Sequence, residues 1–201
     1  MNIAVFISGN GSNLQALIDA EKAQMLSSGK ISLVVSNKPG AYGLTRAQKN
    51  GIKTYLQEVK DFSSREEYDK KVSELLENEN IDLIVLAGFM RLLSEWMVNK
   101  YSGKILNIHP SLLPEFKGTH SIKDAFEAGG KVTGVTVHFV NKELDAGPII
   151  LQEKIAIEEI DILETLEEKI HKVEHRVYPE AVKLFVEGKL RVDGTIVRIL
   201  K

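Results

Sequence analysis

Three polar side chains of this chain have the types and the spacing needed for chemistry at a carbonyl carbon. Asn107 and His109 belong to the run NIHPS at positions 107–111, and Asp145 belongs to LDAGP at positions 144–148. Because Asn107 and His109 are two residues apart, an extended backbone directs both side chains to the same side. An amide donor, an imidazole and a carboxylate can form and collapse a tetrahedral intermediate, which indicates acyl-group transfer.

Each of these residues also has a purely structural explanation. Taken separately, they fit a cap, a turn residue and a hydrogen-bonded polar group at a strand end. Their shared position near the carboxyl ends of predicted strands favours a joint catalytic role, because open parallel sheets bind ligands at that edge.

A glycine-rich turn, GNGSN at positions 9–13, is the second candidate site. Its backbone N–H groups at the start of a predicted helix, with the Ser12 and Asn13 side chains, can bind a phosphate. A dinucleotide fits less well, because Leu14 stands at the third glycine position of that fingerprint and the second strand ends in SNK without an acidic residue. A simple turn with a helix cap is the alternative interpretation.

A competing pattern lies near the carboxyl terminus, where HKVEH at positions 171–175 matches the H-x-x-E-H motif of inverted zinc proteases. The four-residue spacing places both histidines on one helix face. No third ligand follows, since the later acidic residues Glu180, Glu187 and Asp193 lie in helix-end and hairpin contexts. We therefore favour a polar helix face that lines or covers a cleft.

Three further polar residues have roles that the sequence leaves open. His138 is either a core histidine with a partner or a support for the site. His120 lies in a loop that we expect to be flexible and is a candidate ligand contact. Arg91 follows a predicted strand and is either a surface charge or a recognition group for a polar ring or a carboxylate.

The elements that must position these residues alternate between strand and helix in the first half of the chain. Strands are predicted from continuous apolar runs, and helices from apolar periodicity and capping residues such as Ser63 or Ser64 and Ser94. This alternation predicts an open parallel sheet of the α/β class. The predicted strands cover 3–7, 31–35, 83–87 and 104–108, and the predicted helices cover 13–21, 43–49, a segment through 72–76 and a segment after 94.

The second half of the chain changes character. Residues 134–140 and 149–157 are rich in β-branched side chains with no clear helix between them, so this part of the sheet should be partly antiparallel. A long helix is expected over 162–186, with a kink at Pro179 and an end at Gly188. Asp193 and Gly194 predict a terminal hairpin. No linker divides the sequence, so a single domain over 1–201 is predicted.

The composition argues against several other classes of protein. With 201 residues, of which 43% are hydrophobic and 27% charged, the chain can bury a sizeable core. A net charge of -2 gives no electrostatic footprint for nucleic acid or a membrane surface, and the lack of cysteine excludes disulfides and thiolate metal sites. No signal peptide and no apolar stretch of about 20 residues is visible. We expect a cytoplasmic protein that acts on small molecules.

These residues, taken in order, resemble the phosphoribosylglycinamide formyltransferases that use 10-formyltetrahydrofolate. The similarity covers nearly the whole chain and departs mildly at Ala146, where the family often has a second glycine, and in the short carboxyl tail. It implies a Rossmann-like formyltransferase fold, which is an open, mostly parallel twisted sheet with helices on both faces. The motifs that carry it are ISGNGSNLQ (7–15), SN (36–37), AGFMR (87–91), LNIHPSLLP (106–114), VHFV (137–140) and DAGP (145–148).

The same resemblance assigns residues to two small-molecule substrates, glycinamide ribonucleotide and 10-formyltetrahydrofolate. The phosphate and ribose would be held by Gly11, Ser12, Asn13, His171, Lys172, Val173 and Glu174. The folate would be held by Arg65, Met90, Arg91, Leu92, Leu93, Asn107, Lys142, Glu143, Leu144 and Asp145. These assignments give the H-x-x-E-H segment a role in substrate contact, with no metal. The protein is expected to be a monomer or a homodimer.

The resemblance also implies a mechanism within de novo purine biosynthesis. The glycinamide amine would attack the formyl carbon, while Asn107 and protonated His109 donate hydrogen bonds to the oxyanion. Asp145 would keep His109 protonated and help a proton move from the amine to the folate nitrogen. No metal and no covalent intermediate is required.

Three other functions stay open. Methionyl-tRNA formyltransferases share the Asn, His and Asp pattern but would need a basic carboxyl-terminal domain for tRNA. Formyltetrahydrofolate hydrolases use water as the acceptor and typically have an amino-terminal regulatory domain, which we do not expect because the sheet begins at Asn2. A non-enzymatic nucleotide-binding module leaves the three catalytic candidates unexplained. Formyl transfer to glycinamide ribonucleotide is the predicted function.

Overall fold

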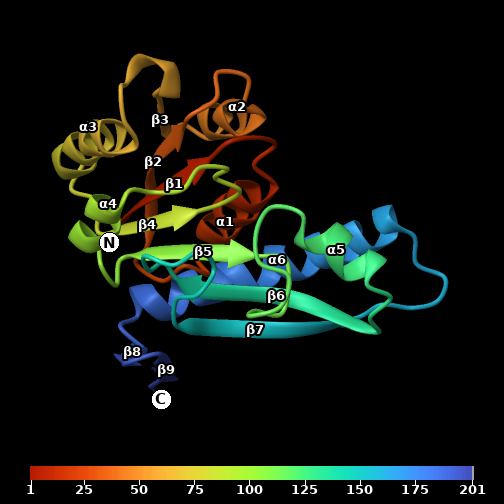
Figure 1. The fold of residues 1–201 in the computed structure, drawn as a ribbon. Coiled ribbons are helices and arrows are strands. Elements are labelled where there is room, and N and C mark those ends of the chain that lie inside the picture. The colour runs from red at the N-terminus through yellow and green to blue at the C-terminus, as the bar shows by residue number, and fades with distance from the viewer. Residues whose placement is uncertain (201) are drawn as a thin grey trace.

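The computed structural model describes residues 1–200, so residue 201, the last of the predicted domain, lies outside the described residues. Within this range the chain forms a nine-stranded sheet with the order β3-β2-β1-β4-β5-β6-β7-β9-β8 (Figure 1). The strands are β1 (Asn2–Ile7), β2 (Lys30–Ser36), β3 (Lys53–Leu56), β4 (Leu83–Leu86), β5 (Ile105–His109), β6 (Val132–Phe139), β7 (Ile149–Ala156), β8 (Leu190–Asp193) and β9 (Ile196–Ile199). That residues 1–201 act as one domain stays a prediction.

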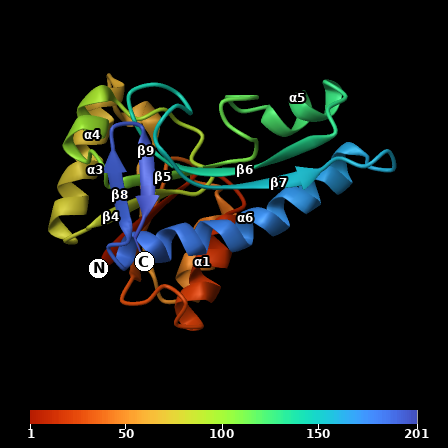
Figure 2. The same ribbon diagram turned by 90° about the horizontal axis from the view of Figure 1, so that it is seen from below.

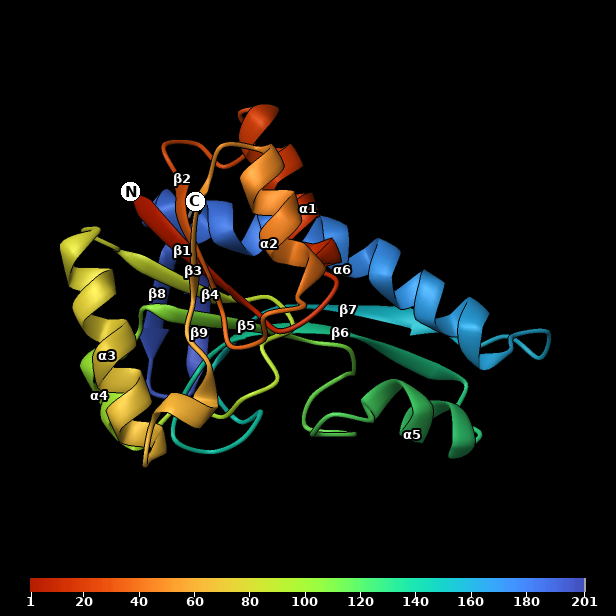
Figure 3. The same ribbon diagram turned by 90° about the horizontal axis from the view of Figure 1, so that it is seen from above.

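Helices cover both faces of this sheet (Figure 2, Figure 3). One apolar cluster joins the sheet to α1, α2 and the long α6, and a second cluster joins it to α3 and α4. The helices are α1 (Ser12–Lys22), α2 (Tyr42–Lys49), α3 (Arg65–Asn78), α4 (Glu95–Lys100), α5 (Ser121–Glu127) and α6 (Leu163–Val186), and a 3-10 turn covers Val59–Asp61. The predicted α/β class with helices on both faces is confirmed.

The first half of the chain forms the predicted parallel sheet. β1 pairs with β2 and β4, and β4 pairs with β5, all in parallel. Ser64 caps α3 by accepting the N–H of Glu67, and Ser94 caps α4 by accepting the N–H of Met97. β3 and α5 were not predicted, because an edge strand of 4 residues and a helix of 7 residues are too short to show a clear period.

The second half is partly antiparallel, as predicted. β6 runs antiparallel to both β5 and β7. Its register places His138 opposite Asn107 and Thr136 opposite His109. The terminal hairpin of β8 and β9 forms where the sequence predicts it and joins β7 through the pairing of Ile149 with Ile196.

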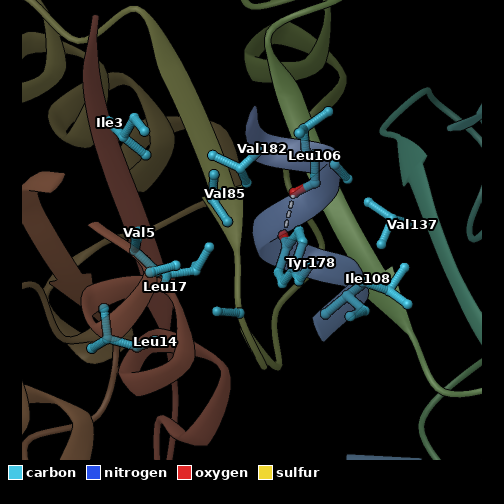
Figure 4. Close-up of a cluster of buried hydrophobic side chains, with 14 of the residues drawn as sticks. Ile3, Val5, Leu14, Leu17, Val85, Leu106, Ile108, Val137, Tyr178 and Val182 are labelled. Atoms are coloured by element: carbon cyan, nitrogen blue, oxygen red, sulfur yellow. Dashed lines mark hydrogen bonds between the residues drawn. The ribbon is translucent and has the colours of Figure 1, made fainter. Parts of the chain in front are cut away.

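The long helix α6 fastens the carboxyl half to the centre of the sheet. Tyr178 is fully buried, and its hydroxyl donates to the carbonyls of Leu86 and Leu106 at 2.8 and 3.1 Å. Figure 4 shows the bond to Leu106. Burial raises the pKa of this phenol well above its ordinary value, so the hydroxyl stays a donor. The contact therefore ties α6 to the last residue of β4 and to the first half of β5.

Helix α6 continues without interruption through Pro179, where we predicted a kink, and it ends just before Gly188. Pro179 is one of the buried residues of this helix. Across residues 1–200 we find no helix that combines the length and the apolar character needed to cross a membrane.

Candidate active site

The predicted site residues gather along one edge of the sheet. β1, β4 and β5 are parallel, so the loops that follow them leave the sheet at the same edge. These loops contain the glycine turn after β1, the segment 87–94 after β4, and the segment after His109. Thr136 and His138 of the antiparallel strand β6 lie beside the end of β5. The fold thus brings segments that are far apart in the sequence to one place.

His109 and Asp145 form a buried pair at this edge. The His109 ring nitrogen Nδ1 lies 3.5 Å from Asp145 Oδ2, and the two residues are 4% and 8% exposed. The other ring nitrogen, Nε2, lies 2.8 Å from the carbonyl oxygen of Phe116. A ring with a proton on each nitrogen satisfies both acceptors. The backbone N–H of Gly118 donates to Asp145 Oδ2 at 2.9 Å, so the loop after β5 covers the pair.

The loop that carries Asp145 has a restricted backbone. Asp145 has a φ of 48°, in the left-handed region that costs an ordinary residue about 1 kcal/mol. Gly147 has no room for a side chain, because a Cβ there would lie 1.7 Å from the carbonyl oxygen of Phe139. Strained non-glycine residues held by tight packing are typical of functional sites. The close contact at Gly147 therefore helps to hold Asp145 beside His109.

Asn107 is oriented by His138. The His138 nitrogen Nδ1 donates to the Phe139 carbonyl at 2.8 Å, which leaves Nε2 as an acceptor for the Asn107 amide at 3.1 Å. Burial lowers the pKa of His138, so the neutral ring that this arrangement needs is favoured. The Asn107 amide nitrogen uses one of its two protons in this bond. The second proton has no other side-chain or backbone acceptor among residues 1–200 and is available to a ligand.

The glycine turn has the geometry of an anion site. Gly11 is the N-cap of α1 with a φ of 74°, and α1 has no acidic residue in its first turn and no side-chain cap. The backbone N–H groups at this helix start therefore keep their positive partial charge. A Cβ on Gly11 would lie 2.8 Å from the Cα of Gly43, because the starts of α1 and α2 are in close contact. Only glycine fits this position.

A polar cluster lies next to the glycine turn. Glu174 of α6 is 4% exposed and accepts hydrogen bonds from Asn13 at 3.1 Å and from His171 at 2.8 Å. The hydrogen bond to Glu174 raises the pKa of His171. The structure thus brings Asn13 and Glu174 together from opposite ends of the chain, and Ser12 lies half-buried beside them.

Arg46 of α2 supports the glycine turn, a role that was not predicted from the sequence. Its guanidinium donates to the backbone carbonyl and the side-chain oxygen of Asn10, both at 2.9 Å, and to Gln15 at 3.3 Å. In the chain, the helix that carries Arg46 is separated from the glycine turn by helix α1, strand β2 and their loops. No motif marks the residue, because its contact depends on how α1 and α2 pack.

The predicted folate residues after β4 divide into two groups. Met90 and Leu92 are 64% and 51% exposed, so their apolar side chains are open to a ligand. Arg91 instead turns inward, where its guanidinium lies 3.3 Å from Asp69 and 3.8 Å from the centre of the Tyr68 ring. Leu93 is half-buried, and Arg65 is exposed on the first turn of α3.

The segment 142–145 lies beside α4. Lys142 pairs with Glu95 of α4, and Glu143 and Leu144 are exposed. Asp145 at the end of this segment is buried against His109. The Lys142 contact therefore links this segment to the first residue of α4, which follows closely on the predicted folate residues 90–93.

Three predicted residues are placed differently from the rest. Lys172 is exposed on α6, while Val173 is partly buried and packs against the apolar core. His120, which we expected in a flexible loop, is the exposed residue that precedes α5.

In the H-x-x-E-H segment, two residues of types that can bind a metal are in contact. His171 bonds to Glu174, and the rings of His171 and His175 lie 6.4 Å apart in a stacked arrangement. Within residues 1–200 no group of three or more His, Cys, Asp and Glu side chains has the arrangement of a metal site. Glu174 instead accepts hydrogen bonds from Asn13 and His171 through the same carboxylate oxygen.

Comparison with known proteins identifies relatives of the chain. The sequence profile described as Formyl transferase matches residues 1–182. Phosphoribosylglycinamide formyltransferase of Escherichia coli (strain K12) is 45% identical over 192 residues, which are 96% of this chain and 90% of that protein. The solved structure of glycinamide ribonucleotide transformylase 1 from Symbiobacterium toebii is 43% identical, with a TM-score of 0.97 over 100% of this chain and 94% of that one.

A longer relative contains the same unit. Trifunctional purine biosynthetic protein adenosine-3 of Gallus gallus is 50% identical over 192 residues, or 96% of this chain. The chain spans 19% of the length of that protein and 14% of the same-named protein of Chironomus tentans.

Proposed function

This chain belongs to the formyl transferase family, and we propose that it transfers a formyl group from 10-formyltetrahydrofolate to the amine of glycinamide ribonucleotide. The proposal rests first on one observation. His109 and Asp145 form a buried pair at the sheet edge where Asn107 holds an unused amide proton. This arrangement supplies hydrogen-bond donors and a proton carrier at one place, as attack on a formyl group requires.

Glycinamide ribonucleotide would bind with its phosphate at the glycine turn. The backbone N–H groups of Gly11, Ser12 and Asn13 at the start of α1 carry the positive end of the helix dipole. Glu174, which is fixed by Asn13 and His171, would accept hydrogen bonds from the ribose hydroxyls. Lys172 and the backbone of Val173 lie on the same helix turn and would complete this end of the site.

The folate would bind across the segments that follow β4 and precede Asp145. Met90 and Leu92 offer exposed apolar surface to the rings. Arg65 offers an exposed positive charge that suits the carboxylates of the glutamate tail. The folate residues of the second segment would be Lys142, Glu143, Leu144 and Asp145, and Arg91 and Leu93 would act mainly through their backbone.

The chemistry would proceed by direct attack. The amine nitrogen of glycinamide ribonucleotide forms a bond to the formyl carbon, and the carbonyl oxygen becomes an oxyanion that accepts hydrogen bonds from Asn107 and His109. The Phe116 carbonyl now accepts the Nε2 proton of His109, so the oxyanion would compete for that same donor. Asp145 holds the positive ring and assists the proton that leaves the amine. The proton reaches the folate nitrogen, and the bond between that nitrogen and the formyl carbon breaks.

The test is to follow 10-formyltetrahydrofolate with and without the acceptor. Enzyme alone should leave the folate nearly unchanged, and adding glycinamide ribonucleotide should start rapid conversion to tetrahydrofolate and formylglycinamide ribonucleotide. Rapid loss of the formyl group without acceptor would identify a hydrolase. Transfer to methionyl-tRNA in place of glycinamide ribonucleotide would also overturn the proposal.

Other expectations stay predictions. Activity should persist after prolonged treatment with a chelator, because the proposed steps use only side-chain donors and a proton carrier. The cytoplasmic location and the choice between monomer and homodimer are also untested, and size measurement in solution would decide the latter.

A further inference from the structure

The loop of residues 87–94, which follows β4, has no regular structure but carries part of the proposed folate site. Met90 and Leu92 in this loop expose large apolar side chains. A loop of this kind needs contacts elsewhere to keep a fixed shape. Asp69 of α3 supplies them at the carboxyl end of the loop.

Asp69 is the centre of a buried polar cluster outside the catalytic residues. It is 1% exposed, and its carboxylate accepts the backbone N–H of Ser94 at 2.5 Å and the guanidinium of Arg91 at 3.3 Å. Ser94 is also the N-cap of α4. One carboxylate thus fixes the end of the loop and the start of the next helix. Burial raises the pKa of Asp69, and the contacts with Ser94 and Arg91 oppose that effect.

Arg91 is held on its other sides as well. Its side chain is 11% exposed, its guanidinium stacks 3.8 Å from the centre of the Tyr68 ring, and it donates to the Arg65 carbonyl at 3.3 Å. A buried guanidinium needs a carboxylate partner, because an unpaired buried charge is costly. Among residues 1–200, Asp69 is the carboxylate that pairs with it.

The amino end of the loop is fastened separately. The Ser8 hydroxyl accepts the N–H of Met90 at 2.8 Å, and the Ser8 N–H donates to the Gly88 carbonyl at 3.0 Å. Ser8 immediately precedes the glycine turn. The two ends of the loop therefore depend on different elements, and a change at Asp69 acts only on the end that lies against α3.

We propose that Asp69 is a positioning residue for the folate, which acts by holding Arg91 and Ser94 and thereby the shape of the 87–94 loop. This inference rests on the proposed function of the loop as part of the folate site. Asp69 lies on α3, away from the glycine turn and from the His109 pair. Its loss should weaken the binding of the folate and leave the binding of glycinamide ribonucleotide largely unchanged.

The test compares Asp69→Asn with a matched control, Asp161→Asn. The control also removes a carboxylate that is buried and hydrogen-bonded, since the Asp161 side chain is 3% exposed and pairs with Lys169 at the start of α6. Both variants keep the size of the side chain. We expect the KM for 10-formyltetrahydrofolate to rise at least about tenfold in Asp69→Asn, because displaced binding groups weaken binding by about this factor. The KM for glycinamide ribonucleotide should stay within about twofold of its value in the unchanged protein. Asp161→Asn should change neither constant.

A second variant keeps the test decisive if Asp69→Asn folds poorly. Arg91→Gln removes the other partner and by itself should raise the folate KM in the same way. Where Asp69→Asn does fold, the double variant should raise the folate KM no further than the larger single effect, because the two residues act as one unit. The single tryptophan, Trp96, lies on the first turn of α4 and reports the same change through its fluorescence.

Two results would overturn the inference. Equal rises in both KM values would show that Asp69 only stabilises the fold, and an unchanged folate KM in both single variants would show that the loop does not depend on it. Neither result affects the proposed function, which is tested by formyl transfer in the unchanged protein. If that protein does not transfer the formyl group to glycinamide ribonucleotide, the proposed function fails before the variants are compared.

Discussion

The most direct consequence of the glycine turn is that Gly11 tolerates no side chain. Gly11→Ala forces an alanine into a backbone with a φ of 74°, which costs about 1 kcal/mol. The new methyl group would also lie 2.8 Å from the Cα of Gly43, where ordinary contact begins at 3.4 Å. The two helix starts must therefore separate by about 0.6 Å, and Gly43 cannot simply retreat because its N–H is hydrogen-bonded to the Gly9 carbonyl at 3.1 Å.

The size of the loss of stability in Gly11→Ala follows from the backbone strain and from the close contact with Gly43. Backbone strain and overpacking together should lower the free energy of unfolding by about 2–4 kcal/mol. The shifted N–H groups would lose part of their contact with the substrate phosphate. A hydrogen bond to a charged group contributes about 1.5–3 kcal/mol, so the KM for glycinamide ribonucleotide should rise about 10- to 100-fold. The folate KM should change little, because the folate residues lie on other loops.

The assay is steady-state formyl transfer with each substrate varied in turn, together with urea unfolding. Gly40→Ala is the control, because a Cβ at Gly40 meets nothing within 4 Å and its φ is not positive. This control should behave like the unchanged protein in both measurements. An equal rise of both KM values in Gly11→Ala, or an effect of Gly40→Ala as large as that of Gly11→Ala, would refute the assignment of the phosphate to this turn.

Three further outcomes follow from named contacts. Gly147→Ala should lower both kcat, by about tenfold or more, and stability, because its methyl group would collide with a backbone carbonyl and displace the loop that carries Asp145. Tyr178→Phe should lower the free energy of unfolding by about 1–3 kcal/mol in urea, because two buried carbonyls lose a donor. His171→Gln should destabilise the fold more below about pH 6 than above about pH 8, because a raised pKa means that the stabilising charge on His171 is present at low pH and lost as pH rises.

Each of these outcomes has a clear contrary result. Normal kcat in Gly147→Ala would mean that the loop can shift without disturbing the site. Ala146→Gly is the control, because it changes the neighbouring residue of the same loop without adding an atom. A Tyr178→Phe protein of unchanged stability would show that the hydroxyl adds nothing to the packing of α6. If the destabilisation caused by His171→Gln does not depend on pH, the charged hydrogen bond to Glu174 does not stabilise the fold.

Much of the fold could be predicted because its signals are local. Continuous apolar runs marked the central strands, and Ser64 and Ser94 marked helix starts through their capping bonds. The residues that the fold brings together at the sheet edge could also be named, since strand ends in a parallel sheet share one edge. The short elements β3 and α5 were missed, because tertiary packing rather than local pattern stabilises them.

The contacts among site residues could not be predicted from the sequence. That Arg91 turns inward to Asp69 depends on how α3 packs beside the 87–94 loop. The support of Asn10 by Arg46 depends on the contact between α1 and α2. The tautomer of His138 depends on a backbone carbonyl in its own strand. Such pairings arise from packing between elements, which no spacing in the sequence records.

The central claim is that Asp145 and His109 act together on the formyl group. Asp145→Asn tests it most directly, because asparagine keeps the size, tolerates the left-handed backbone at this position, and can still accept the N–H of Gly118. The change removes only the negative charge beside His109. We predict that kcat for formyl transfer falls by about 100-fold or more, with both KM values little changed, because a proton-transfer group is lost while the binding contacts remain. A folded Asp145→Asn protein with near-normal kcat would contradict the account.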